Sequence, residues 1–268
     1  MSRLEDAIRP GRALIPYLTA SDPSSESFLE AALGAVEGGA AALEVGVPHS
    51  DPVADGPVIQ RSHARAAAAG GSLHEALALV SRLREQSPVP LVLFTYLNPV
   101  LAMGPDLFAS RARKAGVDGV LALDVSPEEE PAWFGHLAGE GLDPVVLLGP
   151  HTSEARAARL LTAGGGFVYV LARTGITGTH DGSREGLSER VALARRHSRL
   201  PGAGGCGVRT PRDAREVWSL AEGVVVGSAL IARLEQTETR NARAIAREFA
   251  ANLAADHDDG QCMPGSTP

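Results

Sequence analysis

Short apolar runs alternate with longer amphipathic stretches along the chain, and this alternation restricts the fold more than any other feature of the sequence. Repeated strand-helix units produce a parallel sheet, because each helix returns the chain to the end of the sheet where the next strand begins. Eight such units within 268 residues predict a TIM (β/α)8 barrel. The expected strands are Ala13–Leu18, Ala41–Val47, Leu91–Thr95, Gly119–Leu123, Pro144–Leu148, Gly166–Leu171, a weak run near Leu200–Gly204, and Gly223–Val226.

The stretches between these runs have the periodicity of amphipathic helices. A polar helix, Thr239–Ala255, is expected to follow the barrel and to cover one of its ends. Residues 1–255 are therefore expected to form one barrel domain with extra terminal helices, and residues 256–268 a disordered tail. The alternative fold is a doubly wound open sheet, although no Gly-x-Gly-x-x-Gly motif follows the first strand. The helices expected within the barrel are Ser25–Glu37, Leu73–Glu85, Asp106–Ala115, Pro131–Gly139, Glu154–Ala163, Leu187–His197 and Pro211–Leu220.

Charge and composition restrict the possible partners and the compartment. The formal net charge of −7 argues against a nucleic-acid surface, because neutralising phosphates requires an extended basic face. No run approaches the ~18 apolar residues that a membrane span needs. Cys206 and Cys262 are far apart, so a disulfide framework is not expected. We expect a cytoplasmic protein that binds neither nucleic acid nor membrane.

The segment from Glu44 to Pro57 places three carboxylates at the end of the second expected strand, where barrel enzymes keep their catalytic groups. Leu43 and Val45 flank Glu44 and should point to the opposite face, so Glu44 should point into the mouth of the barrel. Burial there would raise its pKa toward a value that suits acid/base chemistry. The segment therefore predicts that Glu44 is catalytic.

The other two carboxylates of this segment, Asp51 and Asp55, lie in a loop that can bend back over Glu44. Asp55 is either a second catalytic group or only a cap for the helix that begins at Pro57. Asp51 precedes Pro52 and is expected to be a turn residue.

Glycine-rich segments follow the last three expected strands: Arg173–Gly178, Gly204–Gly207 and Val226–Ala229. Glycines allow backbone N–H groups to converge on an anion, and a helix that opens at Ser228 would add the positive end of its dipole. Because TIM barrels bind phosphate after their late strands, these segments predict a phosphate site.

Metal and imine chemistry are not expected. The eight histidines show no metal-ligand spacing, and most of them are expected to be solvated on helices or loops. Lys114 is the only lysine, and it lies near the end of an expected helix, where it should face solvent rather than form a Schiff base. Cys206 is expected to be a small packing residue rather than a reactive thiol.

The residues from Glu44 to Gln60 resemble the E-x-G-x-P-x-S-D-P-x-A-D-G-P-x-I-Q signature of the tryptophan synthase alpha subunit family. The resemblance extends from about Ala13 to Leu234. It also includes Pro16–Thr19, Tyr96–Pro99, Tyr169 with Arg173–Gly178, and Val226–Ala229.

This resemblance implies a TIM barrel that cleaves indole-3-glycerol phosphate by a retro-aldol reaction, without cofactor or metal. The indole would pass to a separate beta subunit in an α2β2 complex. By the same resemblance, Glu44 is the acid/base, Asp55 stabilises the indole N–H, and Tyr169 lines the site beside them. The implied phosphate ligands are Gly178, Gly205, Gly207, Gly227 and Ser228. Tyr17, Phe94, Leu121 and Leu123 could form the indole pocket, with core packing as the alternative for each.

Three other functions remain open at this point. The chain could be a stand-alone lyase that releases indole for a specialised pathway, or a catalytically quiet subunit that activates its partner, although Glu44 and Asp55 argue against the latter. A metal-dependent sugar-phosphate epimerase would need paired histidines and acids. The sequence differs from the usual motifs of the family at His49, at Cys206 and at Asp124–Ser126. The differences near His49 affect the loop that is expected to contact the beta subunit.

Overall fold

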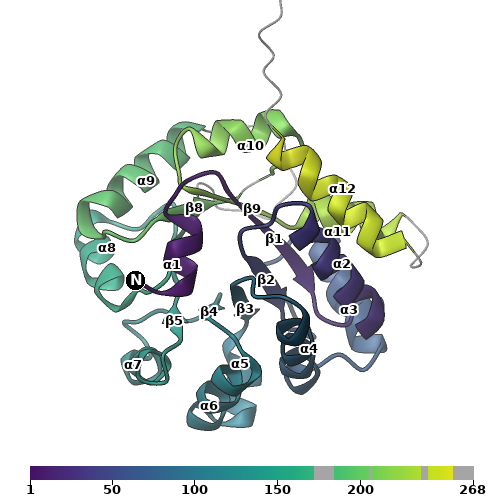
Figure 1. Cartoon of the computed structure of the whole chain (residues 1–268). Coiled ribbons are helices and arrows are strands. Elements are labelled where there is room, and N and C mark those ends of the chain that lie inside the picture. Colours follow the sequence, from purple (N-terminus) through teal and green to yellow (C-terminus); the bar gives the residue numbers. More distant parts are fainter. Residues whose placement is uncertain (172–183, 206, 237–240, 256–268) are drawn as a thin grey trace, which may run out of the picture.

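A computed structural model describes residues 1–171, 184–205, 207–236 and 241–255. Its strands are all parallel and form a ring, with the helices around the outside (Figure 1). The predicted TIM barrel is therefore confirmed. The strand segments are β1 (Ala13–Thr19), β2 (Leu43–Gly46), β3 (Leu91–Thr95), β4 (Gly119–Ala122), β5 (Asp143–Pro144), β6 (Val146–Leu148), β7 (Val168–Val170), β8 (Gly202–Gly204) and β9 (Gly223–Val226).

The fifth expected strand is present as two short segments, β5 and β6, which are separated by Val145. β5 pairs with β4, whereas β6 pairs with β7. The backbone N–H of Val145 also donates to the carbonyl of Val120, at 2.9 Å. The two segments together thus occupy one strand position, and they join the two edges of the sheet.

The helices agree with most of the expected ranges, and several begin at a side-chain cap. Ser24, Ser72 and Ser153 each accept a hydrogen bond from a backbone N–H of the first turn that follows. Thr210 and Asp213 form a reciprocal capping box. The helices are α1 (Arg3–Ile8), α2 (Ser25–Glu37), α3 (Pro57–Ala68), α4 (Leu73–Gln86), α5 (Leu97–Met103), α6 (Pro105–Ala115), α7 (Pro131–Gly139), α8 (Glu154–Leu160) with the 3-10 turn η1 (Leu161–Ala163), α9 (Arg184–His197), α10 (Pro211–Trp218), α11 (Ser228–Glu235) and α12 (Ala242–Ala254).

Helix α12 does not cover an end of the barrel, and that expectation was wrong. It packs along α2 on the outside of the ring (Figure 1). Gly34 of α2 and Gly38, the residue directly after α2, lie against the backbone carbonyls of Arg243 and Arg247, and a Cβ at either glycine would collide with them. The absence of two side chains therefore lets the two helix backbones approach closely. The expected tail, residues 256–268, lies outside the described residues.

The short helix α1, which was not expected, lies at the end of the barrel where the strands begin. Leu4 and Ile8 are fully buried, and their methyl groups would lie 2.6 Å from a Cβ on Gly119 and 3.3 Å from one on Gly223, respectively. Two apolar residues in a six-residue helix are too few to give a periodic signal. With this end closed, the opposite end, where the strands finish, is left for a site.

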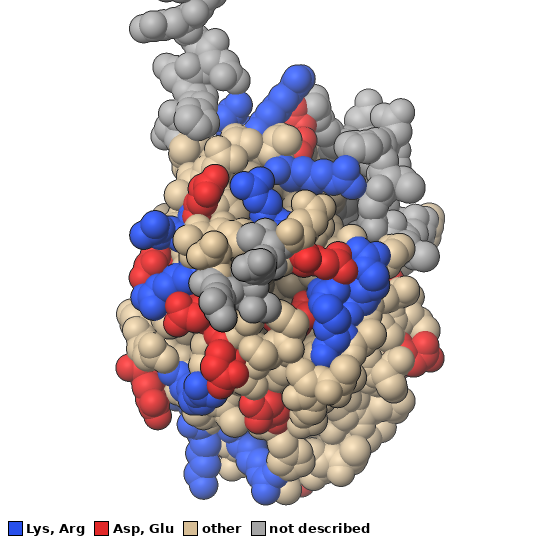
Figure 2. Space-filling view, turned by 90° about the vertical axis from the view of Figure 1, so that its right-hand side faces the viewer, with Lys and Arg blue, Asp and Glu red and all other residues tan. Residues whose placement is uncertain are grey.

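On the side of the molecule shown in Figure 2, acidic and basic side chains are interspersed, and neither charge forms a large patch of its own. Many of them form ion pairs, such as Arg61 with Glu235 and Arg243 with Glu37. Among the described helices, none combines the length and the apolar composition that crossing a membrane would require.

Candidate active site

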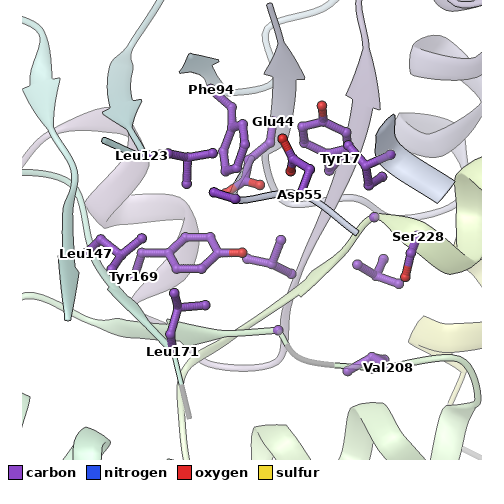
Figure 3. A pocket seen from close by; sticks show the side chains of 17 residues that line it. Tyr17, Glu44, Asp55, Phe94, Leu123, Leu147, Tyr169, Leu171, Val208 and Ser228 are labelled. Carbon is purple, nitrogen blue, oxygen red and sulfur yellow. The ribbon is translucent and has the colours of Figure 1, made fainter. Parts of the chain in front are cut away.

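A cavity of about 200 Å³ lies at the end of the barrel where the strands finish. Strand residues Tyr17, Glu44 and Phe94 line it together with Asp55 from the loop after β2. Figure 3 shows the carboxyl groups of Glu44 and Asp55 pointing into the same space, with Tyr169 and Ser228 on other sides of it. The structure thus brings together side chains that lie far apart in the sequence.

Glu44 is a buried acid with no hydrogen-bond partner among the residues that the structure describes. It lies on β2, where its neighbour in β1 is Tyr17, and only 1% of its surface is exposed. Neither carboxyl oxygen has a hydrogen-bond partner within the described part of the chain. Burial raises the pKa of Glu44 to about 8. The group is therefore protonated at neutral pH and can act as an acid toward a ligand in the cavity.

Asp55, in contrast, is held by neighbouring polar groups. The hydroxyl of Tyr96 donates to Oδ2 of Asp55 at 2.8 Å, and Nε2 of His63 lies 3.4 Å from the same oxygen. The side chain of Gln60 donates to the Asp55 carbonyl at 2.9 Å. Burial, followed by the nearby Asp55 charge, raises the pKa of Tyr96 well above its usual range, so Tyr96 keeps its proton and remains a donor.

The wall beside these acids is aromatic. The ring of Tyr17 meets that of Phe94 edge to face, with centroids 5.1 Å apart. Gly46 is required below this contact, because a Cβ there would collide with the Tyr17 hydroxyl. Burial, together with the Asp55 charge, raises the pKa of Tyr17 well above its usual range.

Of the other expected pocket residues, Leu123 and Tyr169 line the cavity, whereas Leu121 does not. Leu121 also points inward, at the same register as Phe94, but it is fully buried in the core. It lies one inward-facing position before Leu123, below the floor of the cavity, so the core-packing alternative applies to it. Leu147 and Leu171, which were not expected, complete the apolar wall.

The expected phosphate residues lie on the side of the cavity formed by β8, β9 and α11. Gly205, Gly207, Gly227 and Ser228 all line the cavity, and Ser228 is the first residue of α11. A Cβ at Gly205 would collide with the carbonyl of Val225. The first turn of α11 directs free N–H groups and the positive end of its dipole toward this side. Gly178 and Cys206 lie outside the described residues.

Sequence reasoning missed His63 and the partner role of Tyr96. Most histidines were expected to be solvated, but His63 is 1% exposed and faces Asp55. Its position among apolar residues of α3 was a weak signal for burial. Asp51 is exposed in its turn and Lys114 is exposed on α6, as expected. Within the described ranges, no group of three histidine, cysteine, aspartate or glutamate side chains could hold a metal ion.

The sequence matches the family described as tryptophan synthase alpha chain over residues 5–259. The tryptophan synthase alpha chain of Burkholderia thailandensis is 40% identical, over 99% of this chain and 100% of its own length. That of Dechloromonas aromatica is also 40% identical, over 97% and 99%. A structure of Mycobacterium tuberculosis tryptophan synthase superimposes with a TM-score of 0.86 at 33% identity and covers 94% of this chain and 97% of its own. The chain therefore belongs to the tryptophan synthase alpha chain family.

Proposed function

We propose that this chain cleaves indole-3-glycerol phosphate to indole and glyceraldehyde 3-phosphate, as the alpha subunit of a tryptophan synthase in tryptophan biosynthesis. The observation that supports this most is Glu44, which burial keeps protonated and which has no hydrogen-bond partner in the described part of the chain, in a cavity that is also lined by the start of α11. The indole ring of the substrate would contact the apolar wall of the cavity, and its phosphate would bind on the side lined by Gly205, Gly207 and Gly227.

Glu44 supplies the proton that makes the carbon–carbon bond labile. It donates to C3 of the indole, and the ring nitrogen stabilises the resulting iminium ion. The bond between C3 and the glycerol chain then breaks, and its electron pair returns to the ring. The hydroxyl on the adjacent carbon becomes an aldehyde and returns its proton to Glu44. The protonated ring is thus the electron sink, so no lysine imine is required.

Asp55 is suited to the other end of the indole ring. A fixed carboxylate can accept the indole N–H and stabilise the positive charge that develops there. The phosphate binds at Gly205, Gly227 and the first turn of α11, and this remote contact aligns the reacting bond with Glu44. Tyr169 closes the wall between the two sides.

The proposed partner is a tryptophan synthase beta subunit. Its docking at the mouth is supported by exposed apolar side chains in segments that follow β2 and β3. Val53 is 69% exposed and Leu101 is 52% exposed. Both residues follow the carboxyl ends of barrel strands, at the end of the barrel where the cavity lies.

The experiment measures indole release from indole-3-glycerol phosphate by wild type, Glu44→Gln and Glu85→Gln. We expect Glu44→Gln to be slower by about 1000-fold, because it cannot donate the proton. Glu85→Gln changes an exposed acid on α4 and should match wild type. Equal rates for wild type and Glu44→Gln would refute the assigned role.

Adding a beta subunit to the same assay tests the partner. Activity that rises on mixing supports an alpha subunit. A wild-type rate that is already high and does not change on mixing would support the stand-alone lyase instead.

A further inference from the structure

His63 is a buried titratable side chain that the proposed mechanism does not use. It lies on the inner face of α3, and 1% of its surface is exposed. A buried polar ring normally has a hydrogen-bonding reason for its position, because leaving it unsatisfied is costly. The contacts of its two nitrogens show what that reason is.

One nitrogen of His63 is an acceptor. The loop between β2 and α3, residues 47–56, is called the mouth loop here. The backbone N–H of His49, near the start of this loop, donates to Nδ1 of His63 at 3.1 Å. Because Nδ1 accepts a hydrogen bond from this donor, the proton of the neutral ring is on Nε2. A backbone N–H cannot change its role, so it selects this tautomer.

The other nitrogen therefore presents an N–H to the site. Nε2 lies 3.4 Å from Oδ2 of Asp55 and 3.5 Å from the hydroxyl of Tyr17. Oδ2 of Asp55 also accepts the Tyr96 hydroxyl, at 2.8 Å. This oxygen is therefore hydrogen-bonded to Tyr96, and the His63 ring lies next to it. The second oxygen, Oδ1, accepts no hydrogen bond from the described part of the chain.

From this arrangement we infer that His63 is a positioning residue, which holds the Asp55 carboxylate with Oδ2 toward the protein and Oδ1 toward the ligand N–H. It links the two ends of the mouth loop, because His49 and Asp55 both contact its ring. The inference rests on the proposed function, since it gives Asp55 the indole N–H as its ligand. A carboxylate that is already oriented stabilises the developing charge without reorganising.

Two substitutions separate the two contacts of the ring. His63→Asn keeps an acceptor near the position of Nδ1 but loses the donor to Asp55. His63→Gln keeps a donor near the position of Nε2 but loses the acceptor for His49. Ala64→Ser, on the exposed side of the same helix turn, is the matched control.

For indole release, we expect His63→Asn to lower kcat about tenfold with little change in KM, because the Asp55 carboxylate loses the ring that orients it. His63→Gln should restore kcat to within about threefold of wild type. In an Asp55→Asn background, His63→Asn should have almost no further effect, because the two residues act as a unit. Equal losses in the Asn and Gln variants, or an undiminished loss in the Asp55→Asn background, would overturn the inference.

A second measurement does not depend on activity. The ¹⁵N NMR spectrum of histidine-labelled protein, assigned by comparison with His63→Gln, should show Nδ1 unprotonated and Nε2 protonated at neutral pH. The opposite tautomer or a doubly protonated ring would overturn the inference even if the enzyme is active. Wild type that releases no indole would instead refute the proposed function, and the tautomer would still be read from the spectrum.

Discussion

The two ends of the barrel each contain a buried carboxylate, but the two acids have opposite surroundings. Asp118 precedes β4, at the end where the strands begin, and accepts hydrogen bonds from Arg3, Arg84 and the backbone N–H of Leu91 at 2.7–2.8 Å. Glu44, at the mouth, is also buried and has no hydrogen-bond partner among the described residues.

This difference indicates what each end of the barrel is for. A buried charge that is paired and hydrogen-bonded stabilises the fold or is neutral to it, whereas an unpaired acid is forced to keep its proton. The mouth therefore contains a destabilising group that is suited to proton transfer. The end where the strands begin contains Asp118, a fully hydrogen-bonded carboxylate that links α1, α4 and β3.

The largest expected effect concerns Glu44 and pH. The pKa of about 8 in the folded protein lies above the ordinary 4.5, so the folded state binds this proton more tightly than the unfolded state. The resulting stability is present below about pH 4.5 and is lost as pH rises to about 8. Relative to wild type, Glu44→Gln should therefore gain up to about 5 kcal/mol in unfolding free energy between pH 4 and pH 9. Urea unfolding at several pH values measures this, and parallel curves for the two proteins would contradict it.

At the opposite end, Asp118→Asn should lower the unfolding free energy by about 3 kcal/mol, because it removes the negative charge that Arg3 and Arg84 face and replaces one acceptor oxygen with an NH2 donor. Turnover by the folded fraction should not change, since the residue is far from the mouth. Glu85→Gln, an exposed acid on α4, is the control for stability. A variant that unfolds like wild type would show that the comparison between the two ends is wrong.

The rate of indole release should fall about tenfold for each pH unit above about 8, because Glu44 must be protonated to donate. Measuring kcat from pH 6 to pH 10 gives the profile. A rate that stays constant to pH 10 would mean that another group supplies the proton.

The smallest expected effect is that of Tyr96→Phe, which removes one donor from Asp55 and leaves the ring that stacks on His49, with centroids 4.5 Å apart. We expect kcat to fall about fivefold and the unfolding free energy to change by less than about 1 kcal/mol. Steady-state kinetics and thermal unfolding check both. A large loss of stability with normal kcat would make Tyr96 a structural residue only.

Most of the fold could be predicted because its signals are local. α2 and α7 occur at the predicted residues, since each has a clear start and an apolar face. The division into β5 and β6 could not be predicted, because it reflects which neighbour each half pairs with. The place of α12 depends on Gly34 and Gly38, whose role is visible only when another backbone is packed on them.

The sequence by itself determined the barrel, the inward direction of Glu44 and the glycines at the ends of the late strands, because strand alternation and chain order are encoded locally. Only the tertiary structure decided that Glu44 has no hydrogen-bond partner among the described residues, that Leu121 lies below the cavity and that His63 faces Asp55. Those properties depend on distances between side chains from different strands and helices. Such distances exist only after the ring has closed.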